Sequence, residues 1–124
     1  MDSDPLTHEI IGAAIAVSKG TRTGLLENPY ETFLAHELVK RGLAIERQTA
    51  FAVEYDGVRV DIAFRPDLVV ERKVIVEVKA VPKLLPVHDQ QVLTYMYFSG
   101  VPKGLLLNFH AFPFTKEGIR RFIL

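Results

Sequence analysis

The chain has 124 residues, of which 48% are hydrophobic, and its 15 lysines and arginines balance 15 aspartates and glutamates to a net charge of zero. This length and composition predict one folded domain spanning residues 1–124, not a disordered tail. The lack of cysteine excludes a disulfide framework, a thiolate nucleophile and a cysteine-ligated zinc, and the zero net charge argues against a general coat for polyanions.

The longest apolar run near the N-terminus, residues 10–17, is far shorter than the roughly 20 residues of a membrane-spanning helix. The sequence also lacks the basic leader and the cleavage pattern of a secretory signal. We therefore expect a cytoplasmic protein with no membrane partner. Any surface that binds phosphate must be a local patch.

Apolar spacing and turn residues predict two helices and a hairpin in the first half of the chain. Asp4 and Pro5 suit the cap and the first turn of one helix. Pro29 belongs in the first turn of another helix, with Asn28 as its N-cap. Asp56-Gly57 is a strong signal for a two-residue hairpin turn. The expected elements are a helix at 6–19, a second helix ending at 41–42, and strands at 44–55 and 58–64.

The second half of the chain predicts a buried strand pair, a helix and two further strands. Residues 74–79 are almost continuously apolar, which is typical of a strand covered on both faces. The expected elements are strands at 68–70 and 74–79 with a charged turn at 71–73, a helix at 86–99, and strands at 104–109 and 119–124. This order predicts an α/β fold in which a mixed central sheet is flanked by helices.

The residues with the most chemical content are Asp67, Glu77 and Lys79. Asp67 begins one predicted strand and Glu77 lies on the next, so the tight turn between the strands brings two carboxylates together. Two acids at one place suit a hard divalent cation, because Mg²⁺ takes oxygen ligands. Lys79 shares a strand face with Glu77, since side chains at i and i+2 point the same way. Its ammonium group can hold an attacking water or balance charge on a phosphate.

A surface ion pair between Lys79 and the acids is the alternative interpretation, and the chain is then a structural α/β domain. The flanking residues 74–76 and 80–81 are apolar, however, so these charges interrupt a segment with the pattern of a buried strand. Because unpaired buried charge is costly, charges kept in such a place are candidates for function.

Two motifs in the chain resemble those of a known family. Residues 24–30 match the G-x-x-E-x-x-Y signature of the GxxExxY proteins. Pro66-Asp67 followed by Glu77-Val78-Lys79 resembles the PD-(D/E)XK nuclease motif, and the whole resemblance extends over residues 6–109. It implies a restriction-endonuclease-like αβββαβ core and a metal-dependent phosphodiesterase site.

The resemblance also implies roles for individual residues. Asp67 and Glu77 become ligands of Mg²⁺ or Mn²⁺, with the backbone carbonyl of Val78 as a third ligand. Lys79 becomes the group that positions the attacking water. Glu27 becomes the acid that a helix lends to the metal.

A second acid competes with Glu27 for this last role. Asn28 and Glu31 have the spacing of an N-cap and its N3 glutamate, so local acids on this helix can simply form a capping box. We assign Glu31 to the capping box and Glu27 to the metal, and the reverse assignment stays open.

Three residues of the helix predicted at 86–99 share one face: His88, Gln91 and Tyr95. Gln91 and Tyr95 are similar to the Q-x-x-x-Y motif of the RecB-like branch of the same superfamily, which implies that they help to position DNA and the lysine. Alternatively, Tyr95 packs in the core and Gln91 faces solvent. We interpret His88 as an orienting or phosphate-contacting group, or as a polar first-turn residue. Arg65, beside Asp67, is a candidate phosphate contact.

These residues favour a Mg²⁺- or Mn²⁺-dependent nuclease that hydrolyses phosphodiester bonds with a metal-activated water. The alternative is a catalytically silent nuclease-fold module for nucleic-acid binding or complex assembly, because a small neutral chain has little surface for substrate recognition. The expected partner is nucleic acid, DNA rather than RNA. We also expect a homodimer or a partner protein, since cutting both strands of a duplex needs two sites. Phe109, Phe112 and Phe114 suit a base-stacking surface, the core or a subunit interface.

Overall fold

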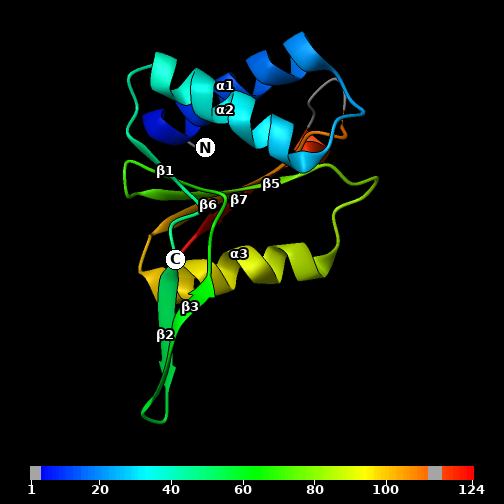
Figure 1. Ribbon diagram of the computed structural model, residues 1–124. Coiled ribbons are helices and arrows are strands. Elements are labelled where there is room, and N and C mark those ends of the chain that lie inside the picture. The colour runs from blue at the N-terminus through cyan, green and yellow to red at the C-terminus, as the bar shows by residue number, and fades with distance from the viewer. Residues whose placement is uncertain (1–3, 112–115) are drawn as a thin grey trace.

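A five-stranded sheet with helices on both faces forms the body of the protein (Figure 1). The computed structural model describes residues 4–111 and 116–124. The helices α1 (Pro5–Thr21) and α2 (Glu27–Lys40) lie against one face of the sheet, and α3 (Pro86–Ser99) lies against the other. The predicted α/β class, with a mixed sheet flanked by helices, is confirmed.

The order of the strands in the sheet places β4 beside β5, so the start of β4 lies next to the end of β5. The sheet has the order β1-β4-β5-β6-β7 and consists of β1 (Ile45–Arg47), β4 (Leu68–Val70), β5 (Val74–Lys79), β6 (Lys103–Asn108) and β7 (Ile119–Ile123). β4 and β5 are antiparallel, and β5 and β6 are parallel because the chain crosses over through α3. Along the chain, α2, β1, β4, β5, α3 and β6 have the expected αβββαβ order.

β5 is covered on both faces, as its apolar run predicts. Its three valines belong to the core under α1 and α2, whereas Ile75 belongs to the smaller core that α3 covers. Glu77 and Lys79 share the Ile75 side, because alternate residues of a strand point the same way. Both polar residues of this strand are therefore directed to the α3 side of the sheet.

The single strand predicted at 44–55 is wrong, because the chain turns at Gln48 and divides it in two. Gln48 has a φ of 54°, in the left-handed region that a regular strand cannot contain. β1 before this turn joins the central sheet, while β2 (Phe51–Tyr55) pairs with β3 (Val58–Phe64) in a separate hairpin that projects past α3 (Figure 1). The hairpin turn predicted at Asp56-Gly57 is confirmed, with positive φ at both residues.

The capping box predicted for the second helix is also wrong. The helix begins at Glu27, and its N-cap is Leu26, whose side chain makes no capping hydrogen bond. Glu31 therefore lies in the second turn of the helix and not in the first. The residue is buried, with 4% of its surface exposed. Its carboxylate is committed to groups outside the helix, because a carboxylate at this depth needs partners.

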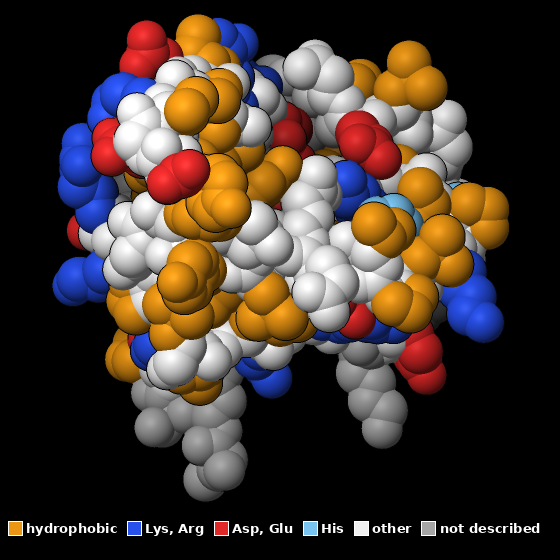
Figure 2. Space-filling model, turned by 90° about the horizontal axis from the view of Figure 1, so that it is seen from below, with side chains coloured by type: hydrophobic (Ala, Val, Ile, Leu, Met, Phe, Trp, Pro, Cys, Tyr) orange, Lys and Arg blue, Asp and Glu red, His pale blue; other side chains and the backbone are white. Residues whose placement is uncertain are grey.

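The hairpin rests on the body through stacked aromatic rings at its base. The rings of Phe51 and Phe64 lie 5.3 Å apart, and Phe64 stacks on Tyr95 of α3 at 4.4 Å. Farther out, large apolar side chains such as Tyr55 and Val58 are exposed. Figure 2 views the molecule from the side toward which the hairpin projects, and hydrophobic side chains form a band over the hairpin on the left of that view.

Phe109 belongs to the core, where its ring stacks on that of Tyr30 at 4.8 Å. A base-stacking role for Phe109 is therefore wrong, because its side chain is 1% exposed. Phe112 and Phe114, the other two aromatic candidates, lie outside the described residues. Within the ranges that the structure describes, no helix combines the length and the apolar character needed to cross a membrane.

The predicted cap of the first helix is confirmed, and it also anchors the helix to the sheet. Asp4 Oδ1 accepts a hydrogen bond from the Leu6 backbone N–H at 3.2 Å. Asp4 Oδ2 lies 2.7 Å from Lys103 Nζ at the start of β6. The hydrogen bond from Lys103, followed by that from Thr7, lowers the pKa of Asp4 from 3.8 to about 2.

We predict that the Lys103→Ala variant loses stability only above the pH range in which Asp4 titrates. Asp4 has a lower pKa folded than unfolded, so its stabilising effect is present above pH 3.8 and is lost as the pH falls toward 2. Urea unfolding should show a deficit of about 1 kcal/mol at pH 6, because the pair is partly exposed, and a much smaller deficit at pH 2.5. An equal deficit at both pH values would contradict this assignment.

Candidate functional site

Asp67 and Glu77 meet at one end of the β4–β5 pair. Leu68 pairs with Val76, so the residue before β4 comes to lie opposite Glu77. The Asp67 backbone N–H donates to Glu77 Oε2 at 2.6 Å, and the Val78 N–H donates to Asp67 Oδ2 at 2.8 Å. Each carboxylate is thus held by the backbone of the neighbouring strand.

Among the acids at this strand end, Glu77 has the pKa that is shifted most strongly. The residue is 3% exposed, so its carboxylate is almost fully removed from water. Burial, followed by the negative charge of Asp67, raises the pKa of Glu77 to about 8, while the Asp67 N–H and the charge of Lys79 act in the opposite direction. Structural carboxylates are seldom kept at such a position without a paired cation, so this site is a functional candidate.

Lys79 is half-buried at the end of β5, on the same side of the strand as Glu77. Its charge acts on Glu77, yet it makes no ion pair with any carboxylate of the described residues. The structural interpretation, in which Lys79 neutralises the acids directly, is therefore wrong for the described part of the chain. The lysine stays available for another negatively charged group.

A third carboxylate, that of Glu31, joins the site from α2. Arg47 Nε and Nη2 donate to Glu31 Oε2 at 3.1 and 3.0 Å. Gln48 Nε2 donates to Glu31 Oε1 at 2.9 Å and to Asp67 Oδ1 at 3.1 Å. Burial, and next the negative charge of Asp67, raises the pKa of Glu31, and Arg47 counteracts this effect. Glu31, Asp67 and Glu77 therefore form one electrostatic group.

Glu27 lies one helical turn before Glu31 and on the same side of α2. It is exposed, and its Oε2 accepts a hydrogen bond from the Ala80 backbone N–H at 3.3 Å. The acid of the G-x-x-E-x-x-Y motif thus contacts the backbone just beyond β5. Glu31, not Glu27, is the helix acid whose charge acts on Asp67 and Glu77.

The predicted residues of α3 lie on the same side of the sheet as the acids. Gln91 Nε2 donates to Tyr95 Oη at 2.9 Å. Burial and then the charge of Glu77 raise the pKa of Tyr95, which indicates that its hydroxyl lies near the acids. Gln91 is half-buried, so the expectation that it faces solvent is wrong. Tyr95 does pack against the smaller core under α3, as the same alternative expected.

The two remaining candidates have less contact with the acids. His88 Nδ1 accepts a hydrogen bond from the Leu85 backbone N–H at 2.9 Å, so this ring nitrogen caps α3. Arg65 is exposed at the end of the hairpin, two residues before Asp67. Their predicted roles toward phosphate stay predictions.

Apolar spacing and turn residues did not place Arg47 or Gln48 in the site. Both belong to the site because the chain turns at Gln48 and not at a glycine or proline. The available signal was weak: a run of four polar residues, 46–49, interrupted the predicted strand. A long-range contact between α2 and this turn is invisible to local periodicity.

The donor set suits a divalent cation in its chemistry but is not arranged around one. Carboxylate oxygens are the ligands that Mg²⁺ and Mn²⁺ prefer. In residues 4–111 and 116–124, however, no three side chains of His, Asp or Glu converge closely enough to hold a metal ion. The backbone N–H groups and the Gln48 amide occupy oxygens of these acids. The residues present therefore have the donor chemistry for a cation, and a cation would have to replace these hydrogen bonds in order to bind.

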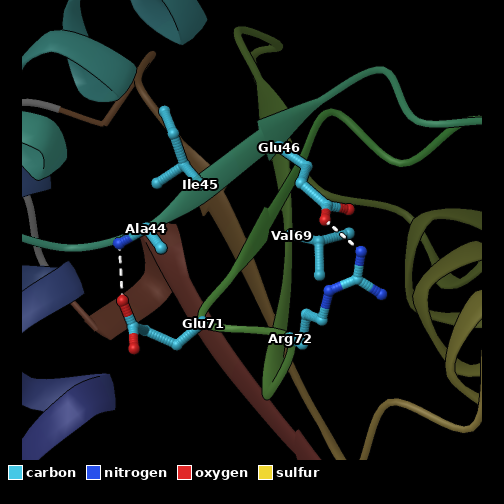
Figure 3. A pocket seen from close by; sticks show the side chains of 6 residues that line it. All are labelled: Ala44, Ile45, Glu46, Val69, Glu71 and Arg72. Atoms are coloured by element: carbon cyan, nitrogen blue, oxygen red, sulfur yellow. Dashed lines mark hydrogen bonds and ion pairs between the residues drawn. The ribbon is translucent and has the colours of Figure 1, made fainter.

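A hollow at the other end of β4 is not a second candidate site. It lies between β1 and the turn after β4, and its charged groups already have partners within the hollow (Figure 3). Glu71 accepts a hydrogen bond from the Ala44 backbone N–H, and Arg72 pairs with Glu46 at 2.7 Å. These contacts hold the turn in place and leave no free chemical group.

The mixed five-stranded sheet with helices on both faces, and the αβββαβ order of its elements, are consistent with a restriction-endonuclease-like fold. The sequence matches the family model of the PD-(D/E)XK nuclease superfamily over residues 4–122, and the chain belongs to this superfamily. No curated protein and no solved structure matches the chain.

The tyrosine of the G-x-x-E-x-x-Y motif has a structural role. The Tyr30 side chain is buried, and its hydroxyl donates to the Arg22 carbonyl at 2.6 Å and accepts from the Leu25 N–H at 3.2 Å. Tyr30 thereby ties the loop between α1 and α2 to the core. It also fixes the start of α2, the helix from which the site takes its third acid.

We predict that Tyr30→Phe destabilises the fold by about 1–2 kcal/mol, because two loop groups lose their hydrogen-bond partner. Tyr55→Phe is the matched control, since Tyr55 is 81% exposed on the hairpin and should change stability by less than about 0.5 kcal/mol. Urea unfolding of both variants measures the difference. Equal stability of the two variants would show that the Tyr30 hydroxyl does not stabilise the loop.

Proposed function

We propose that this protein is a divalent-cation-dependent nuclease that hydrolyses phosphodiester bonds of nucleic acid. The observation that carries the proposal is the meeting of Asp67, Glu77 and Glu31 at one strand end, beside a lysine with no ion-pair partner among the described residues. Membership of the nuclease superfamily supports the same conclusion. The motif in residues 24–30 favours the GxxExxY branch.

Asp67 and Glu77 would hold Mg²⁺ or Mn²⁺, together with the backbone carbonyl of Val78. When bound, the cation supplies a water of lowered pKa and positive charge for the phosphate. We assign the helix acid to Glu31 in place of Glu27, because the charge of Glu31 acts on both strand acids. Glu27 is left with a positioning role at the end of β5.

Lys79 would orient the attacking water or balance charge that develops on the phosphate. Its position favours this role, because it shares a strand side with Glu77 and its ammonium group has no ion-pair partner within residues 4–111 and 116–124. Gln91 would orient Tyr95 toward the same place, and both would contact the substrate or the lysine. These roles are consistent with the bond between the two side chains.

A hollow near the end of β6 is lined by Lys83, His110 and Arg120 but also by Glu117, and Arg120 is paired with Asp89, so the hollow has no clear excess of positive charge. Asn108, which also lines it, is the register partner of Lys79 across β5 and β6. Figure 2 shows acidic, basic and histidine side chains around a recess beside the hydrophobic band. We propose DNA as the substrate, with Arg65 and His88 as further phosphate contacts. A second copy of the chain or a partner protein would supply the second site for a duplex.

A catalytically silent module for nucleic-acid binding or complex assembly is the second candidate. It is favoured by the backbone N–H groups that occupy Glu77 and Asp67, because a site without turnover can keep these bonds permanently. Cation-independent binding of nucleic acid, without cleavage, would distinguish this module from a nuclease.

We predict that Asp67→Asn, Glu77→Gln and Lys79→Ala each lower cleavage by about 10²-fold or more, because each removes charge at the reacting phosphate. The measurement is cleavage of a panel of single-stranded, duplex and branched DNA and RNA in Mg²⁺ or Mn²⁺. Lys73→Ala is the matched control, since Lys73 is an exposed lysine in the turn at the opposite end of β4 and β5.

Normal cleavage by Lys79→Ala would contradict the assigned mechanism. No cleavage of any substrate by the wild-type protein, with metal-independent binding, would replace the nuclease with the silent module. Circular dichroism and urea unfolding of each variant establish that a loss of activity is not a loss of fold.

A further inference from the structure

The side-chain amide of Gln48 stands between two acids of the site. Its nitrogen lies 2.9 Å from Glu31 Oε1 and 3.1 Å from Asp67 Oδ1. A glutamine amide nitrogen carries two hydrogens and accepts none, so these two bonds use its full donor capacity. One uncharged group thus bridges two carboxylates that come from different elements, α2 and the start of β4.

The backbone of Gln48 adopts an unfavourable conformation that places its side chain between the two acids. Its φ of 54° lies in the left-handed region, which costs a residue with a side chain roughly 1 kcal/mol. The Gln48 N–H donates to the Asp67 carbonyl at 3.1 Å, which fixes the turn directly beside the acid. Such a conformation persists only where surrounding contacts enforce it, and here they aim the side chain at the site.

The Gln48 amide occupies oxygens that a cation would need. The negative charge of Asp67 raises the pKa of Glu31, which indicates that the two carboxylates repel each other. A divalent cation relieves this repulsion with its charge, whereas the amide relieves it only with two hydrogen bonds. The Gln48 amide and a cation would occupy the same space between Glu31 Oε1 and Asp67 Oδ1. The amide must therefore move away before a cation binds to these two oxygens.

We infer that Gln48 is a positioning residue that holds Glu31 and Asp67 in the metal-free protein and competes with the divalent cation for them. This inference rests on the proposed function, because it concerns the cation of that site. The amide keeps the acids oriented while no cation is bound, and it lowers the apparent affinity for the cation.

The remaining contacts decide the direction of the effect. Without Gln48, Arg47 still holds Glu31 Oε2 through two hydrogen bonds, and the Val78 N–H still holds Asp67 Oδ2. The acids therefore keep most of their orientation after the amide is removed. Removal of the competing Gln48 amide therefore has a larger effect than the small loss of orientation of the two carboxylates. A variant without this amide should bind the cation more tightly.

The test is calorimetric titration of Mn²⁺ into the metal-free wild-type chain and into Gln48→Ala. We expect Mn²⁺ to bind Gln48→Ala about 5- to 10-fold more tightly, while the metal-free variant unfolds at a lower temperature than the wild type. Saturating Mn²⁺ should narrow this difference in unfolding temperature, because a ligand stabilises the state that it binds. A purely structural role for Gln48 would not raise the affinity.

Two further variants keep the experiment decisive. Gln48→Asn is one methylene too short to bridge both acids and tolerates a positive φ, so it should reproduce the gain in affinity with a smaller loss of stability. Thr49→Ala is the matched control from the same turn, where Thr49 contacts Glu46 at 3.4 Å, and it should bind Mn²⁺ like the wild type.

Weaker or unchanged Mn²⁺ binding by both Gln48 variants would overturn the inference and leave the proposed nuclease untouched. Absence of Mn²⁺ binding in the wild type and both variants would also overturn it. The cleavage assay on Asp67→Asn and Lys79→Ala decides the nuclease separately, so the two failures are distinguishable.

Discussion

The antiparallel pairing of β4 with β5 is the constraint on which the rest of the site depends. The short turn between these strands sets Leu68 opposite Val76, and this register alone places Asp67 beside Glu77. Because the strands lie between helices, the two acids meet where water is largely excluded. Their repulsion and desolvation oppose folding, and backbone N–H groups from each strand offset part of this cost. A register shift by one residue would turn one acid to the other face of the sheet.

The second layer of the site comes from segments that are distant in sequence. α2 supplies Glu31, and the turn after β1 supplies Arg47 and Gln48, which hold this carboxylate from both sides. Tyr30 anchors the start of the same helix through its bonds to the preceding loop. The position of the helix acid is therefore fixed by a core tyrosine on one side and by a polar network on the other. Such networks add little stability, and their benefit is orientation.

The β2–β3 hairpin is an insertion in the αβββαβ order, and its base touches the site. β2 begins three residues after Gln48 and β3 ends three residues before Asp67, so both connections of the hairpin run past the acids. The stacked rings of Phe51, Phe64 and Tyr95 connect the base of the hairpin to α3, the helix that also carries Gln91. The outer part of the hairpin carries exposed large apolar side chains, in contrast to the packed central sheet.

The sequence by itself determined the helices, the buried central strands, the meeting of Asp67 with Glu77 and the place of Lys79 on the same strand face as Glu77. Each follows from local physics: apolar periodicity identifies the helix from 86 to 99, a continuous apolar run identifies β5, and a turn of three residues forces its flanking strands together. Tertiary structure decided that the strand predicted at 44–55 divides at Gln48, and that Glu31 belongs to the site and not to a helix cap. Neither result has a local signal, because a positive φ at a glutamine and a buried glutamate are each unfavourable alone. They become favourable only when α2 and the start of β4 bring two carboxylates within reach of one amide.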